Sequence, residues 1–226
     1  MDVIVFLSVS MWEWFALILL IFALYRFEIG YHLGQLAFSG FLLATCSYML
    51  FIVFEFNLIA LLVQPIAAFL FFWLMFKIPP LYASIIVING YLAYCLVMST
   101  LYLVTEQFGA VITPSTSTNY AFHAMTGLIL LLLTWFVVRF RLGFSFVHYG
   151  DTGFTAPSLP GQHKKLLPLV AVLGCLILAG FNLIYWRTGY TPLFVVLTAL
   201  SLGLLGYYAV RMEHEIASAR RNKRIG

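Results

Sequence analysis

The segment Val3–Tyr25 reads VIVFLSVSMWEWFALILLIFALY, and it decides the fold class of this chain. Glu13 is the only charged residue in it, and no proline or glycine interrupts it. An α-helix needs about 20 predominantly apolar residues to cross the hydrocarbon core of a bilayer. The segment therefore predicts a transmembrane helix.

Further apolar segments of similar length follow along the chain. Backbone polar groups find no water in hydrocarbon, so a spanning segment forms a helix or part of a closed barrel. A membrane β-barrel alternates apolar and polar residues, whereas Leu128–Leu133 reads LILLLL. The sequence predicts an all-α, polytopic transmembrane bundle of seven helices. Their expected spans are Val3–Tyr25, Leu33–Phe54, Leu58–Phe76, Leu81–Val104, Tyr120–Val138, Leu166–Trp186 and Pro192–Val210.

The overall composition agrees with a membrane protein. Of the 226 residues, 63% are apolar and 9% are charged, whereas about a quarter of the residues of an average soluble domain are charged. Such a chain cannot cover a water-facing surface, which excludes a soluble globular domain, a disordered chain and a nucleic-acid module. The longest polar stretch, Arg139–Lys165, is too short for a core of its own and is expected to be an irregular loop. We expect one membrane domain, residues 1–210, and a basic helical tail, residues 211–226.

The basic residues predict the orientation. With the N-terminus outside, 11 of the 12 Lys and Arg residues lie inside and only Arg187 lies outside. This asymmetry follows the positive-inside rule and predicts that the N-terminus is out and that the C-terminal tail is cytoplasmic. The inner residues are Arg26, Lys77, Arg139, Arg141, Lys164, Lys165, Arg211, Arg220, Arg221, Lys223 and Arg224.

Glu13 is the most unusual residue, because a carboxylate inside a bilayer costs several kcal/mol unless it pairs or meets water. One interpretation is a group that faces a ligand or an ion. The other is a shallower helix, with Trp12 and Trp14 in the outer interfacial belt and Glu13 in water. In either case Arg187 is the expected partner. The predicted ligand-binding set is Glu13, Glu106, His123 and Arg187, together with the outer loop Thr105–Asn119.

Four amides also lie inside the apolar segments, namely Gln35, Gln64, Asn89 and Asn182. Asn and Gln side chains between membrane helices usually bond to a neighbouring helix. The alternative is that they line one polar path with Glu13, as in a transporter. Pro65 follows Gln64 and predicts a kink in the third helix.

No cofactor, metal site or catalytic motif is predicted. The histidines lie at different depths, which argues against a haem held between two helices, and no Lys lies in a span to hold retinal. The three cysteines have no C-x-x-C spacing, and the peptidase and phosphate-loop motifs are missing. We therefore expect no enzyme within this chain. The inner group of His148, Asp151, His163, Lys164 and Lys165 is interpreted as a solvated loop near lipid headgroups, with a metal or lipid-phosphate site as the alternative.

Seven crossings with the N-terminus outside, little soluble mass and a cytoplasmic helical tail resemble the membrane sensor region of AgrC/ComD-type peptide-sensing histidine kinases. This resemblance rests on topology. It implies a receptor in the bacterial cell membrane that belongs to a two-component system. Its partners would be an extracellular peptide or small molecule and a cytoplasmic signalling partner bound through residues 211–226, besides the lipid bilayer. The family continues into an ATPase domain, so the chain is expected to be either such a sensor region without its output domain or a separate membrane protein.

Two functions follow from these observations. The first is a signal-sensing module that relays an outer or membrane signal to the tail. The alternative is a small transporter, channel or membrane accessory subunit.

Overall fold

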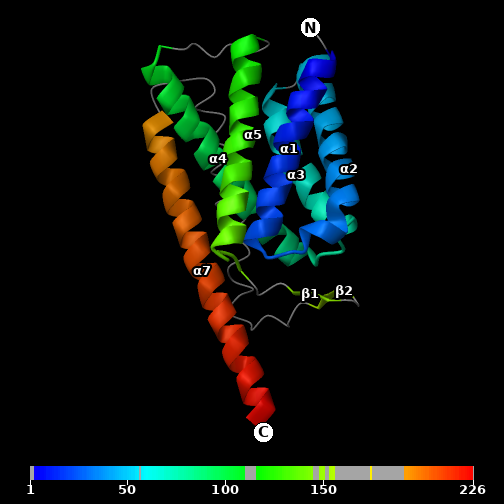
Figure 1. Cartoon of the computed structure of the whole chain (residues 1–226), viewed down its shortest axis with the longest axis vertical. Helices are drawn as coiled ribbons and strands as arrows, with labels where there is room; N and C mark the ends of the chain where they lie inside the picture. The colour runs from blue at the N-terminus through cyan, green and yellow to red at the C-terminus, as the bar shows by residue number, and fades with distance from the viewer. Residues whose placement is uncertain are drawn as a thin grey trace.

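The computed structural model describes residues 3–55, 57–109, 116–144, 148–150, 153–155, 174 and 191–225. Within these ranges the chain forms six α-helices and one short hairpin (Figure 1). The helices are α1 (Val3–Leu24), α2 (Ile29–Tyr48), α3 (Asn57–Leu74), α4 (Pro80–Gln107), α5 (Ser117–Arg139) and α7 (Thr191–Ile225). A π-helical turn, η1 (Met49–Val53), continues α2, and the strands are β1 (His148–Gly150) and β2 (Gly153–Thr155).

Five of the described helical segments are long and apolar enough to cross a membrane. The chain is therefore a multi-pass membrane protein, as its composition predicts. In α3 the corresponding apolar segment, Val63–Leu74, is shorter. The predicted span Leu166–Trp186 lies outside the described residues apart from residue 174, so the count of seven and the orientation of the termini stay predictions. The five segments are Val3–Leu24, Ile29–Val53, Pro80–Gln107, Ser117–Arg139 and Thr191–Arg211.

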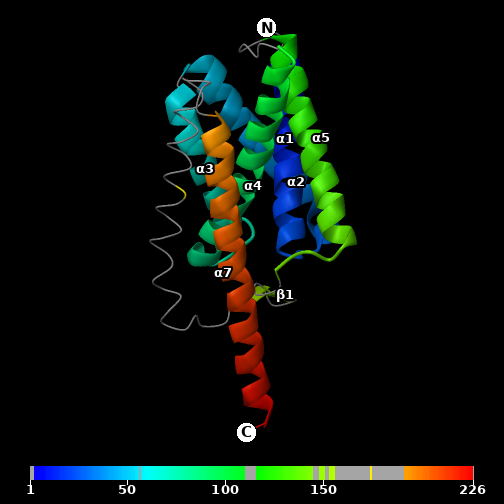
Figure 2. The same cartoon turned by 90° about the vertical axis from the view of Figure 1, so that its left-hand side faces the viewer.

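Helix α1 occupies the centre of the bundle. It packs most extensively against α5 and α2, and it also contacts α4 (Figure 1). Helix α7 packs along α4 at the edge of the bundle and then continues well beyond it (Figures 1 and 2). The helix runs without interruption through residues 211–225, where the sequence predicts a helical tail. The position of this tail in the cytoplasm stays a prediction.

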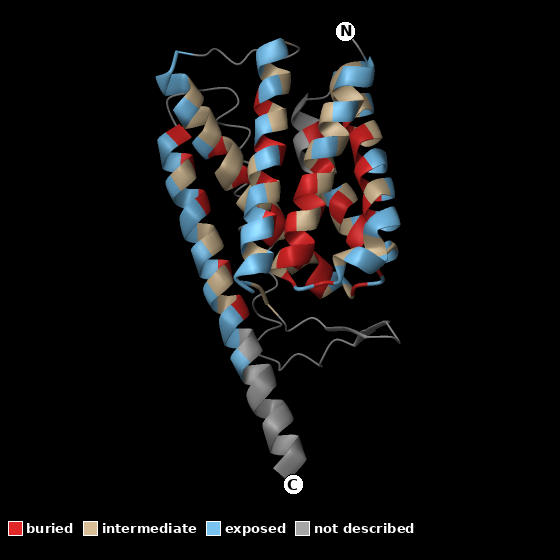
Figure 3. Cartoon of the chain, viewed as in Figure 1, coloured by how far each residue is buried: buried red, intermediate tan, exposed pale blue. Residues whose placement is uncertain are grey.

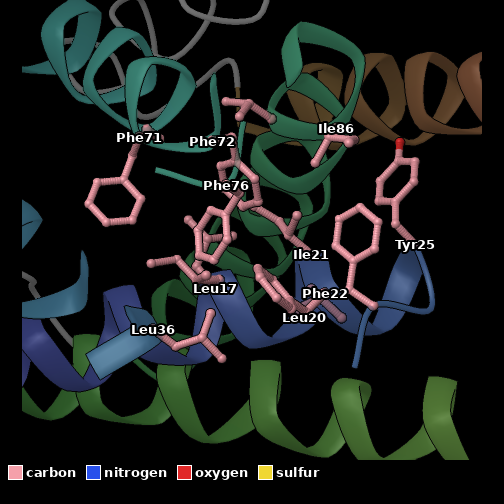
Figure 4. Packing of buried hydrophobic residues seen from close by; sticks show 14 of the residues in the cluster. Leu17, Leu20, Ile21, Phe22, Tyr25, Leu36, Phe71, Phe72, Phe76 and Ile86 are labelled. Atoms are coloured by element: carbon pink, nitrogen blue, oxygen red, sulfur yellow. The ribbon is translucent and has the colours of Figure 1, made fainter. Parts of the chain in front are cut away.

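The buried core gathers around the second half of α1. Leu17, Ile18, Leu20, Ile21 and Phe22 are each at most 3% exposed, and they pack against aromatic residues of α3 and its C-terminal turn (Figure 4). The outward faces of the helices are exposed (Figure 3), and many of their exposed residues are large and apolar. Trp135 and Leu200, for example, are 63% and 65% exposed. Such a surface is stable in lipid, where exposed apolar groups cost nothing.

Two helices end in the same way at the end of the bundle where α1 meets α2. Arg26 after α1 and Arg141 after α5 have positive φ angles of 52° and 54°. The amide of Phe27 bonds to the carbonyl of Phe22 and that of Arg26 to Ala23, which is a Schellman motif. The Arg26 side chain donates to the Arg141 carbonyl at 2.8 Å, so the two helix ends are tied together.

The stretch after α5 is more ordered than the sequence predicts. The prediction of an irregular loop over Arg139–Lys165 is wrong for its hairpin, because β1 and β2 pair antiparallel with His148 opposite Thr155. The pairing continues to Gly150 opposite Gly153. Just before the hairpin, the amide of Phe144 donates to the Leu24 carbonyl at 2.7 Å, which fastens this segment under α1.

The close approach of α4 to α1 depends on Gly90. A Cβ atom at this position would collide with the side chain of Ile21, which is 1% exposed and has little room to move. We predict that Gly90→Ala lowers the free energy of unfolding by about 1–3 kcal/mol, the usual cost of overpacking a core. The measurement is denaturant unfolding of the purified protein in detergent micelles.

Gly203→Ala is the matched control, since a Cβ atom on Gly203 of α7 meets no atom within 4 Å. Alanine has the higher helix propensity, so this control is expected to leave the protein unchanged or to stabilise it by up to about 1 kcal/mol. Equal destabilisation by both substitutions would contradict the close packing of α1 on α4.

Candidate functional site

The candidate site is centred on Glu13, which α1 places between two other helices. Glu13 lies about 15 Å along α1 from Val3 at 1.5 Å per residue, close to the midpoint of this 22-residue helix. The Nδ1 atom of His123, on α5, lies 3.0 Å from Oε1 and 2.9 Å from Oε2 of the carboxylate. The side chains of Glu13 and His123 are 13% and 28% exposed. This is a largely buried acid–imidazole pair across the α1–α5 contact.

A third helix joins the pair through Tyr94. The Tyr94 hydroxyl, on α4, donates to Oε1 of Glu13 at 3.0 Å. One carboxylate thus accepts hydrogen bonds from both α4 and α5, and hydrogen bonds to a charged group are stronger than those between neutral groups. We call Glu13, His123 and Tyr94 the acid–imidazole site.

The two tryptophans beside Glu13 bond to different helices. The indole of Trp12 donates to the carbonyl of Ala124 on α5 at 3.3 Å, and that of Trp14 donates to the Ser47 hydroxyl on α2 at 3.0 Å. Trp12 is 40% exposed and Trp14 is 7% exposed, so they lie on different faces of α1. Glu13 itself bonds to protein groups, which differs from the interpretation that it simply lies in water.

Two buried hydroxyl groups near the site have no hydrogen-bond partner among the described residues. They belong to Tyr91 and Tyr120. The ring of Tyr91 contacts those of Trp14 and Tyr94, with centroid distances of 6.1 and 6.2 Å. Tyr120 precedes His123 by three positions, which places the two on one face of α5. Leaving a buried hydroxyl without a partner costs about 1–3 kcal/mol. The hydroxyl groups of Tyr91 and Tyr120 are therefore available for further hydrogen bonds near Glu13.

The described intramembrane amides bond in separate places. Gln64 donates to Ser47 on α2 at 2.9 Å, and Asn89 donates to the hydroxyl of Tyr25, which follows α1, at 2.6 Å. For these two the prediction of a bond to a neighbouring helical segment is confirmed. For Gln35 it is wrong, because this residue is exposed and its side chain bonds at 2.7 Å to His32 on the same helix. Pro65 lies inside α3.

The structure brings together part of the predicted ligand-binding set. Glu13 and His123 are in contact, whereas Glu106 is exposed in the last turn of α4. Arg187, the expected partner of Glu13, and Asn182 lie outside the described residues. Ligand binding by this set stays a prediction.

Sequence reasoning missed Tyr94 and Tyr91, although a signal for them exists. Both lie on α4 three positions apart and therefore share a helix face, where two aromatic hydroxyls inside a span need partners. Among the residues that the structure describes, no group of His, Cys, Asp and Glu is arranged to hold a metal ion. Asp151 and His163 of the inner loop lie outside them, as does the side chain of His148.

Comparison of the chain with protein-family models, with curated proteins and with solved structures finds no match. The conclusion that the chain is an integral membrane protein therefore rests on its own long apolar helices. The likeness to AgrC/ComD-type sensor regions stays a prediction from topology.

The hydrogen-bonded pair of Glu13 and His123 predicts strong coupling between the two residues. His123→Gln removes the imidazole partner of a largely buried carboxylate. We expect this variant to lower the free energy of unfolding in micelles by about 3 kcal/mol, the low end for a broken buried pair, because both side chains keep some exposure.

The double variant Glu13→Gln/His123→Gln carries two neutral amides that can bond to each other. We expect it to be more stable than the sum of the single variants predicts, with a coupling energy of about 1–3 kcal/mol in a double-mutant cycle. Glu106→Gln is the control for loss of a carboxylate and is expected to have no effect. Additive single variants would show that the pair contributes no interaction.

Proposed function

We propose that this protein is a signal-sensing membrane module, in which the bundle relays an extracellular or membrane signal through α7 to the tail or to a partner that binds the tail. The module would be similar in role to the sensor regions of peptide-sensing histidine kinases. Its predicted ligand is a peptide or small molecule that reaches the end of the bundle where α1 begins and α5 begins.

The observation that carries this proposal is the double contact of Tyr94. Its hydroxyl bonds to Glu13 on α1. Its ring packs against the small apolar cluster between α4 and α7, which contains Leu92, Cys95, Phe194 and Leu205. A change in the position or charge of Glu13 is therefore transmitted by one rigid side chain to the surface on which α7 rests.

Helix α7 has the form expected of an output element. Thr191, Phe194, Thr198, Leu205 and Ala209 are its buried residues within the bundle, and they are spaced by three, four, seven and four positions. This spacing defines one buried face of α7, and among the described helices α7 packs against α4. Because the same helix continues to Ile225, a rotation or shift within the bundle moves the tail as a rigid body.

A signal needs two states of the bundle for which the ligand has different affinities. The acid–imidazole site supports such a difference. A cationic or hydrogen-bonding ligand that competes for Glu13 would release Tyr94 or His123, and the apolar contacts of α1 with α4 or α5 would then adjust. A ligand that left these bonds intact would not be sensed by this route.

A small transporter or channel is the second candidate, and the depth of Glu13 favours it. Ionisable residues near the middle of a bilayer often mark ion pathways. The described amides do not extend such a path, because Gln64, Asn89 and Gln35 bond to Ser47, Tyr25 and His32 and not to the acid–imidazole site. Ion flux into proteoliposomes that is abolished by Glu13→Gln would favour this candidate.

The sensor proposal is tested by the position of α7. Spin labels at the exposed positions Leu33 on α2 and Val210 on α7, in a variant without Cys46, Cys95 and Cys175, report the distance between the two helices. We expect candidate extracellular peptides or lipids to shift this distance distribution in the full chain in nanodiscs. Tyr94→Phe is expected to reduce the shift by at least half, since it removes the bond between α4 and Glu13.

Tyr102→Phe is the matched control. Tyr102 also lies on α4, and its ring contacts Phe122 instead of the acid–imidazole site. It is expected to leave the shift unchanged. A distance distribution that no candidate ligand alters, or a shift that Tyr94→Phe leaves intact, would contradict the proposed relay.

A further inference from the structure

We propose that the acid–imidazole site binds a proton, with Nε2 of His123 as the atom that accepts it and Glu13 as the counter-charge. The site would thereby make the bundle responsive to the pH of the compartment that α5 faces at its N-terminal end. The proton site rests on the geometry of Glu13 and His123, whereas its role in signalling rests on the proposed function.

The geometry decides which atom takes the proton. Both oxygens of Glu13 lie within 3.0 Å of Nδ1 of His123, and a carboxylate in this position holds the Nδ1–H tautomer of a neutral imidazole. The other ring nitrogen, Nε2, has no hydrogen-bond partner among the residues that the structure describes. Nε2 is therefore the basic atom of the pair. A proton taken from hydronium forms the Nε2–H bond and leaves water.

The charge balance favours uptake of one proton. With Glu13 ionised and His123 neutral, the site carries one net negative charge inside an apolar bundle. One proton on Nε2 makes the pair neutral overall, and the imidazolium then faces the carboxylate at hydrogen-bond distance.

Among the residues that the structure describes, the other groups around the site do not supply a competing charge, and Arg187 lies outside these residues. From α4, Tyr94, Tyr91 and Cys95 are nearby, and Cys46 on α2 lies within electrostatic reach of Tyr91. From α5, Tyr120 shares a face with His123. Glu13 is the only ionisable residue of α1, and Glu106 is exposed at the far end of α4. Hydroxyl and thiol groups are neutral near pH 7, so the pair controls the local charge.

The hydroxyl groups of Tyr94 and Tyr91 can stabilise the charge of Glu13 when His123 is neutral. When His123 is neutral, the carboxylate keeps its full charge, and Tyr94 already donates to it. Tyr91, whose hydroxyl lacks a partner among the described residues, lies within electrostatic reach of Glu13 and can turn toward it. Proton uptake would therefore tighten the contact of α1 with α5 and proton loss would shift the carboxylate toward α4, where the rings of Tyr91 and Tyr94 lie.

The test is a pH titration of the full chain, labelled with ¹⁵N at histidine, in nanodiscs between about pH 5 and 8, where histidine changes its charge. The proposal predicts that the His123 resonance titrates and that its neutral form carries its proton on Nδ1, a tautomer that the bond from Nδ1 of His32 to Gln35 also favours for His32. His123→Gln should remove this resonance. Glu13→Gln should move its titration to lower pH by at least tenfold in proton concentration, because the imidazolium loses its counter-charge.

His32→Gln and Glu106→Gln are the controls, since they remove a histidine and a carboxylate away from the site, and both should leave the resonance unchanged. The His123 resonance can be assigned with either of two variants. If His123→Gln fails to fold, the resonance is identified by its response to Glu13→Gln. The proposal is overturned if no histidine responds to Glu13→Gln, or if the responding histidine keeps one charge over the whole range.

The spin-label distance between Leu33 and Val210, measured over the same pH range, separates the two proposals. A distance that follows the titration supports both. A His123 that titrates while α7 stays fixed under every pH and ligand refutes the sensor function and leaves the proton site. A ligand-dependent movement of α7 with no titration of His123 refutes the proton site alone.

Discussion

The cost of placing a carboxylate inside apolar helices constrains this structure more than any other interaction. Glu13 sits near the middle of the central helix, so each helix that covers it must either supply a polar partner or leave a charge uncompensated. α5 supplies His123 and α4 supplies Tyr94. The rotation of these two helices about their axes is set by that requirement, because turning either one would move its polar group away and bring an apolar side chain against the carboxylate.

The rest of the bundle is held by close packing and by a few hydrogen bonds between helical segments. In lipid, burying apolar surface gives little net stabilisation, so association depends on shape and on polar contacts. Gly90 lets α4 approach Ile21 of α1, and Gly127 lets α5 approach the indole of Trp12. Ser47 accepts hydrogen bonds from Trp14 and from Gln64, which joins α1, α2 and α3 at one hydroxyl. Each neighbour of α1 is thus fastened to it, directly or through one residue, by at least one polar bond.

The proposals of sensing and of proton binding share this central helix. Its charged residue lies in the half that begins the chain, whereas its largest aromatic packing lies in the other half, around Phe22 (Figure 4). The first half of α1 therefore carries the polar group of the candidate site, and the second half is held in place by aromatic packing. Tyr94 connects the first half to α7, which leaves the bundle as a single long helix (Figure 2). In the proposed relay, a polar event inside the membrane and a displacement of α7 outside it would be linked by few intermediate residues.

The sequence by itself determined the class of protein and most helix positions, because apolar segments of spanning length have few other stable structures in a membrane. It also identified Glu13 as unusual, since its polarity conflicts with its surroundings, and it placed His123 in the same predicted ligand-binding set. It could not pair them, because a period of 3.6 residues tells which face a side chain occupies but not which helix lies opposite. The tertiary structure decided that Glu13 meets His123 and Tyr94, that Gln35 stays on its own helix, and that the residues after β1 return in a hairpin. The physical reason is that partners separated by about a hundred residues are chosen by the packing of all the helices together.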